Sequence, residues 1–426
     1  MNVPLSVTVQ SLVAAMLAKS GLRSQFHLMI EVGLGKLEQA ISAACDYVLL
    51  LDVSGSMSGI VGEVSKLDAL KAACENVINR FNPDDRVSII AFDEQPTTMM
   101  ALANCDHRGK TEAINTVYGL GLGGATCFAS ALLAAKQLLH DSSHKRAVLF
   151  FTDGENTGGG DPLPVVTQMR EAGITLYAGG LGVNNQGEQV LDQLAGANFR
   201  SLTTAADVDA FLKDAAAQAA GAIVTNAQLR LTPVTFAQVN NFDLVARNGT
   251  PNYALADSTM RLLPIGDLAE GDRYQAYLGL NIVLPEDIRA GRRAFGKVEV
   301  IGDVVAMGIK GQVLAQTPIA VMFGDQAVAT VNSTVKDMIN TAATARELYL
   351  AGQATNTADA AAHVANARKT AAFSQDAVAS ALRAQMSTIE AQIAKDPDAA
   401  QKAARRATRG FSAEDAAAAL RNLRQS

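Results

Sequence analysis

The chain has 426 residues, of which 49% are hydrophobic, and this is enough to build two or three globular domains. Its formal net charge of −6 gives no general reason to expect nucleic acid as a partner. The four cysteines are too few for a disulfide framework, and they show neither a C-x-x-C pair nor zinc-ligand spacing. Their number and spacing favour a reducing compartment.

The amino-terminal segment does not resemble a signal peptide. No basic residue precedes its apolar run from Leu12 to Ala18, and Lys19 and Arg23 follow where small residues would mark a cleavage site. No apolar segment approaches the length needed to span a bilayer. These features predict a soluble, cytoplasmic protein without a membrane span.

Residues 1–45 contain strand-like segments but are not expected to form a domain alone. Pro4–Gln10 and Gln25–Val32 have strand-like composition, while Ser11–Lys19 is predicted as a short helix.

Residues 46–221 alternate strand-like and helix-like segments, which is typical of a doubly wound, mostly parallel α/β sheet. Tyr47–Leu51 is a continuous apolar run that suits a strand buried on both faces. Further strands are expected at Arg86–Phe92, Thr97–Leu102 (an edge strand), Ala147–Thr152, Ile174–Ala178 and Phe199–Leu202. Helices are expected at Lys66–Phe81, Lys110–Val117, Phe128–His140, Val165–Ala172, Glu188–Leu194 and Ala206–Ala219.

Two further regions follow this α/β domain. Residues 222–330 contain alternating segments bounded by Gly, Pro, Asn and Asp, which predicts an antiparallel β-domain with strands at Gln228–Leu231, Tyr274–Ile282 and Lys297–Ile301. Residues 331–426 are rich in alanine and predict an α-helical region. Its expected helices are Val335–Ala351, Thr357–Phe373, Asp376–Ala394 and Ala413–Leu423.

The strand at Tyr47–Leu51 ends on a group of oxygen-bearing side chains. Asp52, Ser54 and Ser56 alternate along the turn, so we expect them to point to the same side at the carboxyl end of the strand. Mg²⁺ prefers oxygen ligands in octahedral geometry and keeps several waters. One carboxylate and two hydroxyls therefore predict part of a magnesium site with an open position.

The D-x-S-x-S pattern resembles the first element of the metal-ion-dependent adhesion site of von Willebrand factor A domains. Gly123-Gly124-Ala125-Thr126 resembles the threonine loop of that family, although the commoner pattern sets threonine directly after paired glycines. Thr152-Asp153-Gly154, after a strand-like run, resembles the aspartate loop. The resemblance implies direct coordination by Ser54, Ser56 and Thr126, with Asp52 and Asp153 close by and often acting through water.

The same resemblance implies a bacterial intracellular type of protein whose function is to bind other proteins rather than to catalyse a reaction. In the family, an Asp or Glu of a partner completes the shell of Mg²⁺, and Mn²⁺ or Ca²⁺ are alternatives to that ion. Relatives work beside AAA+ ATPases or in stress and defence assemblies. By the same analogy, residues 1–45 would complete a β-sandwich with residues 222–330. A self-assembling subunit that uses the site between copies is an alternative function.

Two rival sites are less well supported by the sequence. A serine or metal-dependent hydrolase would place a nucleophile elbow at Gly55–Gly59, but the G-x-S-x-G spacing falls on Met57 rather than on Ser56 or Ser58. His140 and His144 are expected at the amino end of the sheet, exposed to solvent. The G-x-G-x-x-G pattern at Gly119–Gly124 does not follow a buried strand, which argues against a dinucleotide site. The basic run Lys402, Arg405, Arg406 and Arg409 is predicted as a solvated helix face.

Overall fold

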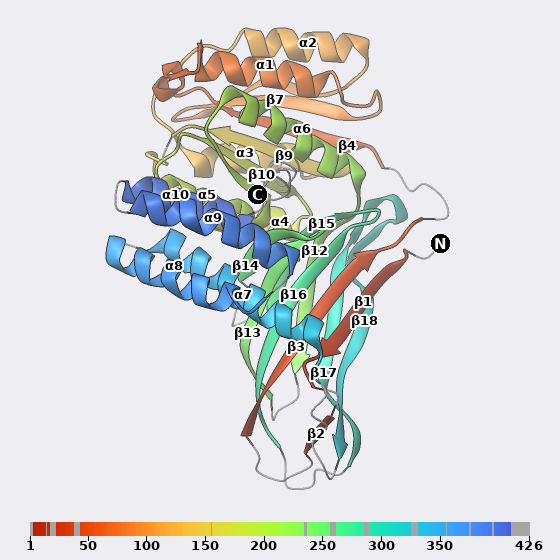
Figure 1. The fold of residues 1–426 in the computed structure, drawn as a ribbon. Coiled ribbons are helices and arrows are strands. Elements are labelled where there is room, and N and C mark those ends of the chain that lie inside the picture. The colour runs from red at the N-terminus through yellow and green to blue at the C-terminus, as the bar shows by residue number, and fades with distance from the viewer. Residues whose placement is uncertain are drawn as a thin grey trace.

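The computed structural model describes residues 3–13, 15–17, 23–37, 43–154, 156–233, 237–255, 261–284, 290–324, 331–354, 356–374, 376–393 and 396–409. An α/β domain lies at one end of the molecule, a pair of β-sheets lies at the other, and the carboxyl-terminal helices lie alongside both (Figure 1).

A six-stranded sheet forms the centre of the α/β domain, in the order β11-β10-β9-β4-β7-β8. Neighbouring strands are parallel except for the edge strand β8, which runs antiparallel to β7. Every residue of β4 is buried, as its continuous apolar run predicts. The strands are β4 (Cys45–Asp52), β7 (Arg86–Phe92), β8 (Pro96–Asn104), β9 (Lys145–Thr152), β10 (Thr175–Leu181) and β11 (Phe199–Leu202).

Helices cover both faces of this sheet, so the predicted doubly wound α/β fold is confirmed. One apolar core joins the sheet to α1 (Lys66–Ile78), α2 (His107–Tyr118) and α6 (Ala205–Gly221). A second core on the opposite face joins it to α3 (Phe128–Leu139), α4 (Leu163–Glu171) and α5 (Asn185–Ala195). Short elements complete the domain, namely η1 (Gly55–Ser58), β5 (Ile60–Val61), β6 (Val64–Ser65) and η2 (Gly196–Asn198).

Two five-stranded sheets form the second part of the molecule. The first has the order β1-β3-β16-β13-β14 and the second β15-β12-β17-β18-β2. All their neighbouring strands are antiparallel except β2 and β18, which are parallel. The first sheet comprises β1 (Leu5–Ser11), β3 (Arg23–Leu34), β13 (Ala237–Arg247), β14 (Thr250–Leu255) and β16 (Arg273–Val283). The second comprises β2 (Ala15–Leu17), β12 (Ala222–Pro233), β15 (Leu262–Ala269), β17 (Gly291–Val304) and β18 (Ile309–Gly324), with η3 (Val305–Met307) between the last two.

The two sheets share one apolar core, to which β3 and β16 contribute from one side and β12 and β17 from the other. Phe26 and Phe295, on facing sheets, place their ring centroids 5.3 Å apart. The predicted helix at Ser11–Lys19 is wrong in the described part of that segment, because Ser11 ends β1 and Ala15–Leu17 is the strand β2. Pairing with β18 outweighs the local helical pattern here.

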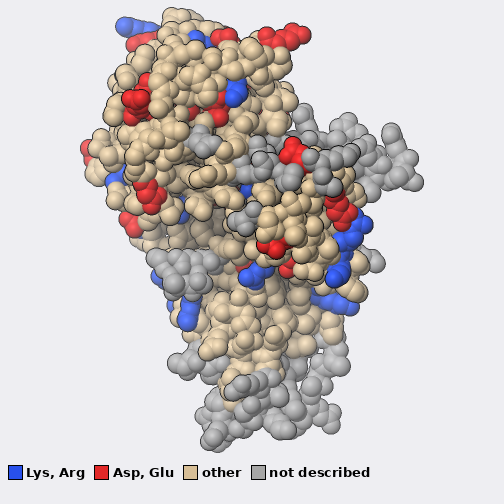
Figure 2. All heavy atoms as spheres, turned by 90° about the vertical axis from the view of Figure 1, so that its left-hand side faces the viewer, with Lys and Arg blue, Asp and Glu red and all other residues tan. Residues whose placement is uncertain are grey.

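In the described residues, four helices follow the second sheet. They are α7 (Ser333–Gln353), α8 (Thr357–Ala371), α9 (Ala377–Ile393) and α10 (Pro397–Arg409), and they share a core with Tyr253 of β14. No helix with the bounds of α10 was predicted, although the basic run from Lys402 to Arg409 within it was predicted as a helix face. The predicted helix Ala413–Leu423 lies outside the described residues. On the face of the molecule drawn in Figure 2, Lys and Arg lie among Asp and Glu.

A buried carboxylate joins the α/β domain to the second sheet. Asp267 of β15 accepts hydrogen bonds from the Tyr177 hydroxyl at 3.0 Å and the Thr175 hydroxyl at 3.1 Å. Its own sheet contributes a third bond from the backbone nitrogen of Asn226 at 3.0 Å. At the junction after the α/β domain, α6 ends at Gly221 and β12 begins at Ala222, so the chain passes there from one part to the other without a linker.

Candidate metal site

The two site aspartates are brought together by adjacent strands. Asp52 is the last residue of β4, and Asp153 directly follows β9. These strands are parallel neighbours, with Leu51 opposite Phe151, so both carboxylates emerge at the same edge of the sheet. This is the carboxyl edge, where ligands bind in open α/β sheets.

Asp52 is fixed by two hydrogen bonds. Its Oδ1 accepts from the backbone nitrogen of Ser54 at 2.8 Å, and its Oδ2 accepts from the Thr152 hydroxyl at 2.5 Å. The residue is fully buried. Burial raises the pKa of Asp52 above its ordinary value, and the hydrogen bonds from Ser54 and Thr152 oppose that rise.

The two serines connect this turn to the aspartate loop. The hydroxyls of Ser54 and Ser56 lie 3.1 Å apart, and the Ser56 hydroxyl donates to Asp153 Oδ1 at 2.7 Å. Asp153 Oδ2 accepts from the ammonium of Lys66 at 2.6 Å. Four of the five predicted residues are thus linked by direct hydrogen bonds, in the order Asp52, Ser54, Ser56 and Asp153.

The threonine loop reaches the same place despite its extra alanine. It is held against the turn after β4, because the nitrogen of Gly123 donates to the Val53 carbonyl at 2.6 Å and the nitrogen of Gly55 donates to the Gly124 carbonyl at 3.1 Å. A Cβ atom built on Gly154 would lie 3.2 Å from the hydroxyl of Thr126. The same point is 3.7 Å from Asp52 Oδ2 and 3.7 Å from the Ser56 hydroxyl, so side chains from the turn after β4 and from the threonine loop meet at Gly154 of the aspartate loop.

These side chains fit a hard divalent cation. The donors are all oxygens, as Mg²⁺ prefers. Within the described part of the chain there is no group of three or more His, Cys, Asp or Glu residues that could hold a metal. Besides the two carboxylates, hydroxyls would therefore have to contribute to the coordination shell of the ion. Ser54 and Thr126 are buried while Ser56 is exposed, so the site opens to solvent at Ser56.

Lys66 is a site residue that the sequence reasoning missed. It is the first residue of α1, where the positive end of the helix dipole disfavours a cation. A lysine at the start of a predicted helix was therefore the sequence signal that could have identified this residue.

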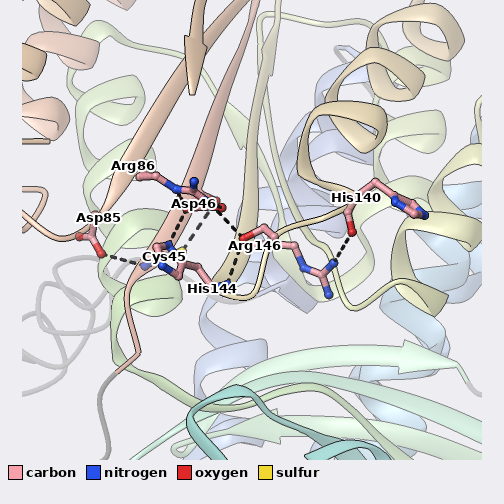
Figure 3. Close-up of polar contacts among 8 residues, drawn as sticks. Cys45, Asp46, Asp85, Arg86, His140, His144 and Arg146 are labelled. Atoms are coloured by element: carbon pink, nitrogen blue, oxygen red, sulfur yellow. Dashed lines mark hydrogen bonds and ion pairs between the residues drawn. The ribbon is translucent and has the colours of Figure 1, made fainter. Parts of the chain in front are cut away.

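A second polar cluster lies at the opposite, amino edge of the sheet (Figure 3). Asp46 is fully buried and accepts from Arg86 Nε at 2.8 Å, and its other oxygen pairs with Arg86 Nη2. The Nδ1 of His144 lies 2.9 Å from Asp46 Oδ1. Burial alone would raise the pKa of Asp46, but the hydrogen bonds from Arg86, Ser142 and His144 outweigh it and hold that pKa below its ordinary value. His144 is therefore part of a structural cluster rather than a solvent-exposed side chain.

The rival motifs take ordinary structural positions. The Ser58 hydroxyl donates to the carbonyl of Gly55 at 2.8 Å, within η1. The G-x-G-x-x-G segment joins α2 to α3 and does not follow a strand directly. All four cysteines are buried and free. The basic run was wrongly predicted as solvated at Arg405, which is buried and pairs with Glu188 of α5 at 3.1 Å.

The molecule thus combines a doubly wound α/β domain, carrying an oxygen-lined site at its carboxyl edge, with a pair of sheets and a helical region. Residues 46–218 match the model of the von Willebrand factor type A domain. These residues are such a domain.

Two bacterial proteins are similar to this chain in sequence. The uncharacterized protein YwmC of Bacillus subtilis is 28% identical over 161 residues, which are 33% of this chain and 68% of that protein. The uncharacterized protein sll0103 of Synechocystis is 24% identical over 321 residues, which are 71% of this chain and 72% of that protein.

Two solved structures share the fold over nearly the whole chain. A von Willebrand factor type A protein from Catenulispora acidiphila superposes with a TM-score of 0.73 at 16% identity, covering 97% of this chain and 98% of that one. The ArnB paralog VWA2 from Sulfolobus acidocaldarius has a TM-score of 0.58 at 14% identity, covering 94% and 97%. No helix in the described part of the chain is long and apolar enough to cross a membrane.

Proposed function

We propose that this chain is a metal-dependent protein-interaction module of the bacterial cytoplasm. Ser54, Ser56 and Thr126 would hold Mg²⁺ directly, with Asp52 and Asp153 beside them, and Mn²⁺ or Ca²⁺ could replace it. A bound ion supplies an electrophilic centre for an acidic side chain of a partner protein. AAA+ ATPases and stress or defence assemblies are the partner classes that the family resemblance suggests.

The observation that carries the proposal is the convergence of three loops on one point near Gly154. Neutral hydroxyls supply most of the donors, so a divalent ion there would keep enough positive charge to attract a carboxylate. The exposure of Ser56 gives that carboxylate a route to the ion. A serine hydrolase would need a histidine near the serines of this turn. His140 and His144 instead precede β9, at the amino edge of the sheet.

The test compares two serines of the same turn. Ser56→Ala removes a proposed ligand, whereas Ser58→Ala removes a hydroxyl that donates to the Gly55 carbonyl within η1. We expect Mg²⁺ binding, measured by calorimetry, to be lost or strongly weakened in Ser56→Ala and unchanged in Ser58→Ala. Proteins from a bacterial lysate should be retained on wild type and Ser58→Ala with Mg²⁺, and released by chelator.

Two outcomes would change the proposal. Equal Mg²⁺ affinity in Ser56→Ala and Ser58→Ala would remove the metal site. Metal binding without metal-dependent retention of a partner would instead favour a self-assembling subunit, which light scattering with and without Mg²⁺ would detect.

A further inference from the structure

Lys66 places a positive charge directly beside the candidate metal site. Its ammonium donates to Asp153 Oδ2 at 2.6 Å, and the side chain of Asp153 is 0% exposed while that of Lys66 is 20% exposed. Among the ion pairs of the described residues, this is the one that includes a proposed ligand. Asp153 is therefore held from both sides, by Ser56 on one oxygen and by Lys66 on the other.

The fold keeps Lys66 there against local preferences. A cation in the first turn of a helix opposes the helix dipole. Fixing a long lysine side chain also loses rotamer entropy. The side chain runs over two glycines: a Cβ on Gly59 would lie 3.3 Å from Lys66 Cε, and one on Gly182 would lie 3.9 Å from its Nζ. The pairing with Asp153 is the interaction that offsets these costs.

We propose that Lys66 is a tethered cation that holds Asp153 in place when no divalent ion is bound and that lowers the affinity of the site for such an ion. This inference rests on the proposed metal site. The carboxylates of Asp52 and Asp153 carry two negative charges, and Lys66 neutralises one of them. A divalent ion must then enter a site whose net charge is −1 rather than −2, against repulsion from the ammonium. Lys66 thereby makes metal binding weaker and more readily reversible.

Substitution of Lys66 gives a direct test. In Lys66→Met and Lys66→Gln we expect Mg²⁺ and Mn²⁺ to bind roughly tenfold more tightly or better, because one repelling charge is gone. Lys66→Arg keeps the charge and should bind as wild type does. The matched control is Lys110→Met, which removes a positive charge from the same domain but whose ammonium bonds the Asn79 carbonyl at 3.0 Å. Calorimetry for Mg²⁺ and the electron paramagnetic resonance signal of free Mn²⁺ give the affinities.

A second readout needs no metal. In chelator, Lys66→Met should unfold at a lower temperature than wild type, because buried Asp153 has lost its charged partner. The Gln variant retains a donor for Asp153, so it should fold if the Met variant does not.

Three results separate the inference from the proposed function. Tighter metal binding in both neutral variants, but not in Lys66→Arg or Lys110→Met, supports it. If wild type binds metal and the neutral variants bind it equally or more weakly, the proposed role of Lys66 is wrong, while the proposed metal site is retained. Absence of metal binding in every variant, wild type included, removes the proposed metal site and this inference together.

Discussion

Arg405 and Glu188 are 217 residues apart in sequence, yet Arg405 Nε lies 3.1 Å from Glu188 Oε2 in a fully buried ion pair. The pair fastens α10 to α5 of the von Willebrand factor type A domain. Arg405 also donates to the carbonyl of Gly352, and a Cβ at Gly352 would lie 2.6 Å from Arg405 Cγ. The last described helix is therefore held by the domain that carries the candidate metal site.

Removing Arg405 should strongly destabilise the protein. Arg405→Met leaves the carboxylate of Glu188 buried without its cation, which costs about 3–5 kcal/mol. Chemical denaturation measures the loss. Arg368→Met is the matched control, because Arg368 pairs with Glu390 on the surface of the same helical region and its loss should cost less than about 1 kcal/mol. Equal losses of unfolding free energy in the two variants would contradict the prediction that the buried Arg405 pair stabilises the fold more than an exposed pair does.

Ser56→Ala should separate metal binding from folding. The side chain is exposed, and Asp153, which accepts its hydrogen bond, also accepts one from Lys66. In chelator we expect the melting temperature to stay close to that of wild type. We expect Mg²⁺ to raise the melting temperature of wild type, and we expect this rise to be largely absent in the variant, since it depends on the ratio of ion concentration to Kd. A variant that melts early in chelator would show that Ser56 is structural.

Asp46→Asn should weaken the amino edge of the sheet at neutral pH. It replaces a carboxylate, which accepts from Arg86 with both of its oxygens, by a neutral amide whose Nδ2 cannot accept, at a cost of about 1.5–3 kcal/mol. The folded-state pKa of Asp46 is lowered, so its contribution is present above the ordinary pKa of an aspartate and is lost as pH falls through the folded value. The difference between wild type and variant should therefore shrink below about pH 4. Asp141→Asn, at a side chain that is 96% exposed, should change stability little at any pH.

Asp243→Asn should have the opposite pH dependence. Burial raises the pKa of Asp243 to about 6, against opposing effects from Arg346 and from the hydrogen bonds of Tyr253 and Asn241. A raised pKa means that this group stabilises the fold when protonated, and that this stability is lost as pH rises from about 4 through 6. Above pH 6 the variant should be about 1–3 kcal/mol more stable than wild type, and below pH 4 the advantage should vanish.

Denaturation at a series of pH values checks this expectation. Asp84→Asn, at an exposed aspartate, serves as the control and should follow wild type throughout. A stability difference for Asp243→Asn that does not change between pH 4 and 7 would contradict a raised pKa in the folded state.

The sequence predicted the α/β domain well because its signals are local. The apolar run before Asp52 specifies a buried strand, and the spacing of apolar residues after Lys66 specifies a helix that covers it. The site loops were identified for the same reason, since each directly follows a strand or opens a helix.

The errors arose where distant contacts decide the structure. Ala15–Leu17 forms a strand because β18, some 300 residues later, pairs with it. Arg405 lies in a run of basic residues that reads as solvated, but its partner Glu188 is on another domain. Lys66 was overlooked because its role depends on Asp153. In the sequence, α1, α2, α3 and β9 lie between the two residues. No window of neighbouring residues contains these pairs.

The order of the strands in the first sheet means that β3 is synthesised long before its partner β16. Gly33 of β3 pairs with Arg273 of β16, and the entire von Willebrand factor type A domain is made between them. At a ribosomal rate of roughly 5–20 residues per second, β3 emerges about 10–50 s before that partner. During this interval β1 can pair with β3 on one side, but the other edge of β3 has no strand to join. Nascent chains of this protein therefore expose an open strand edge, at which they could pair with other chains, until β16 has been made.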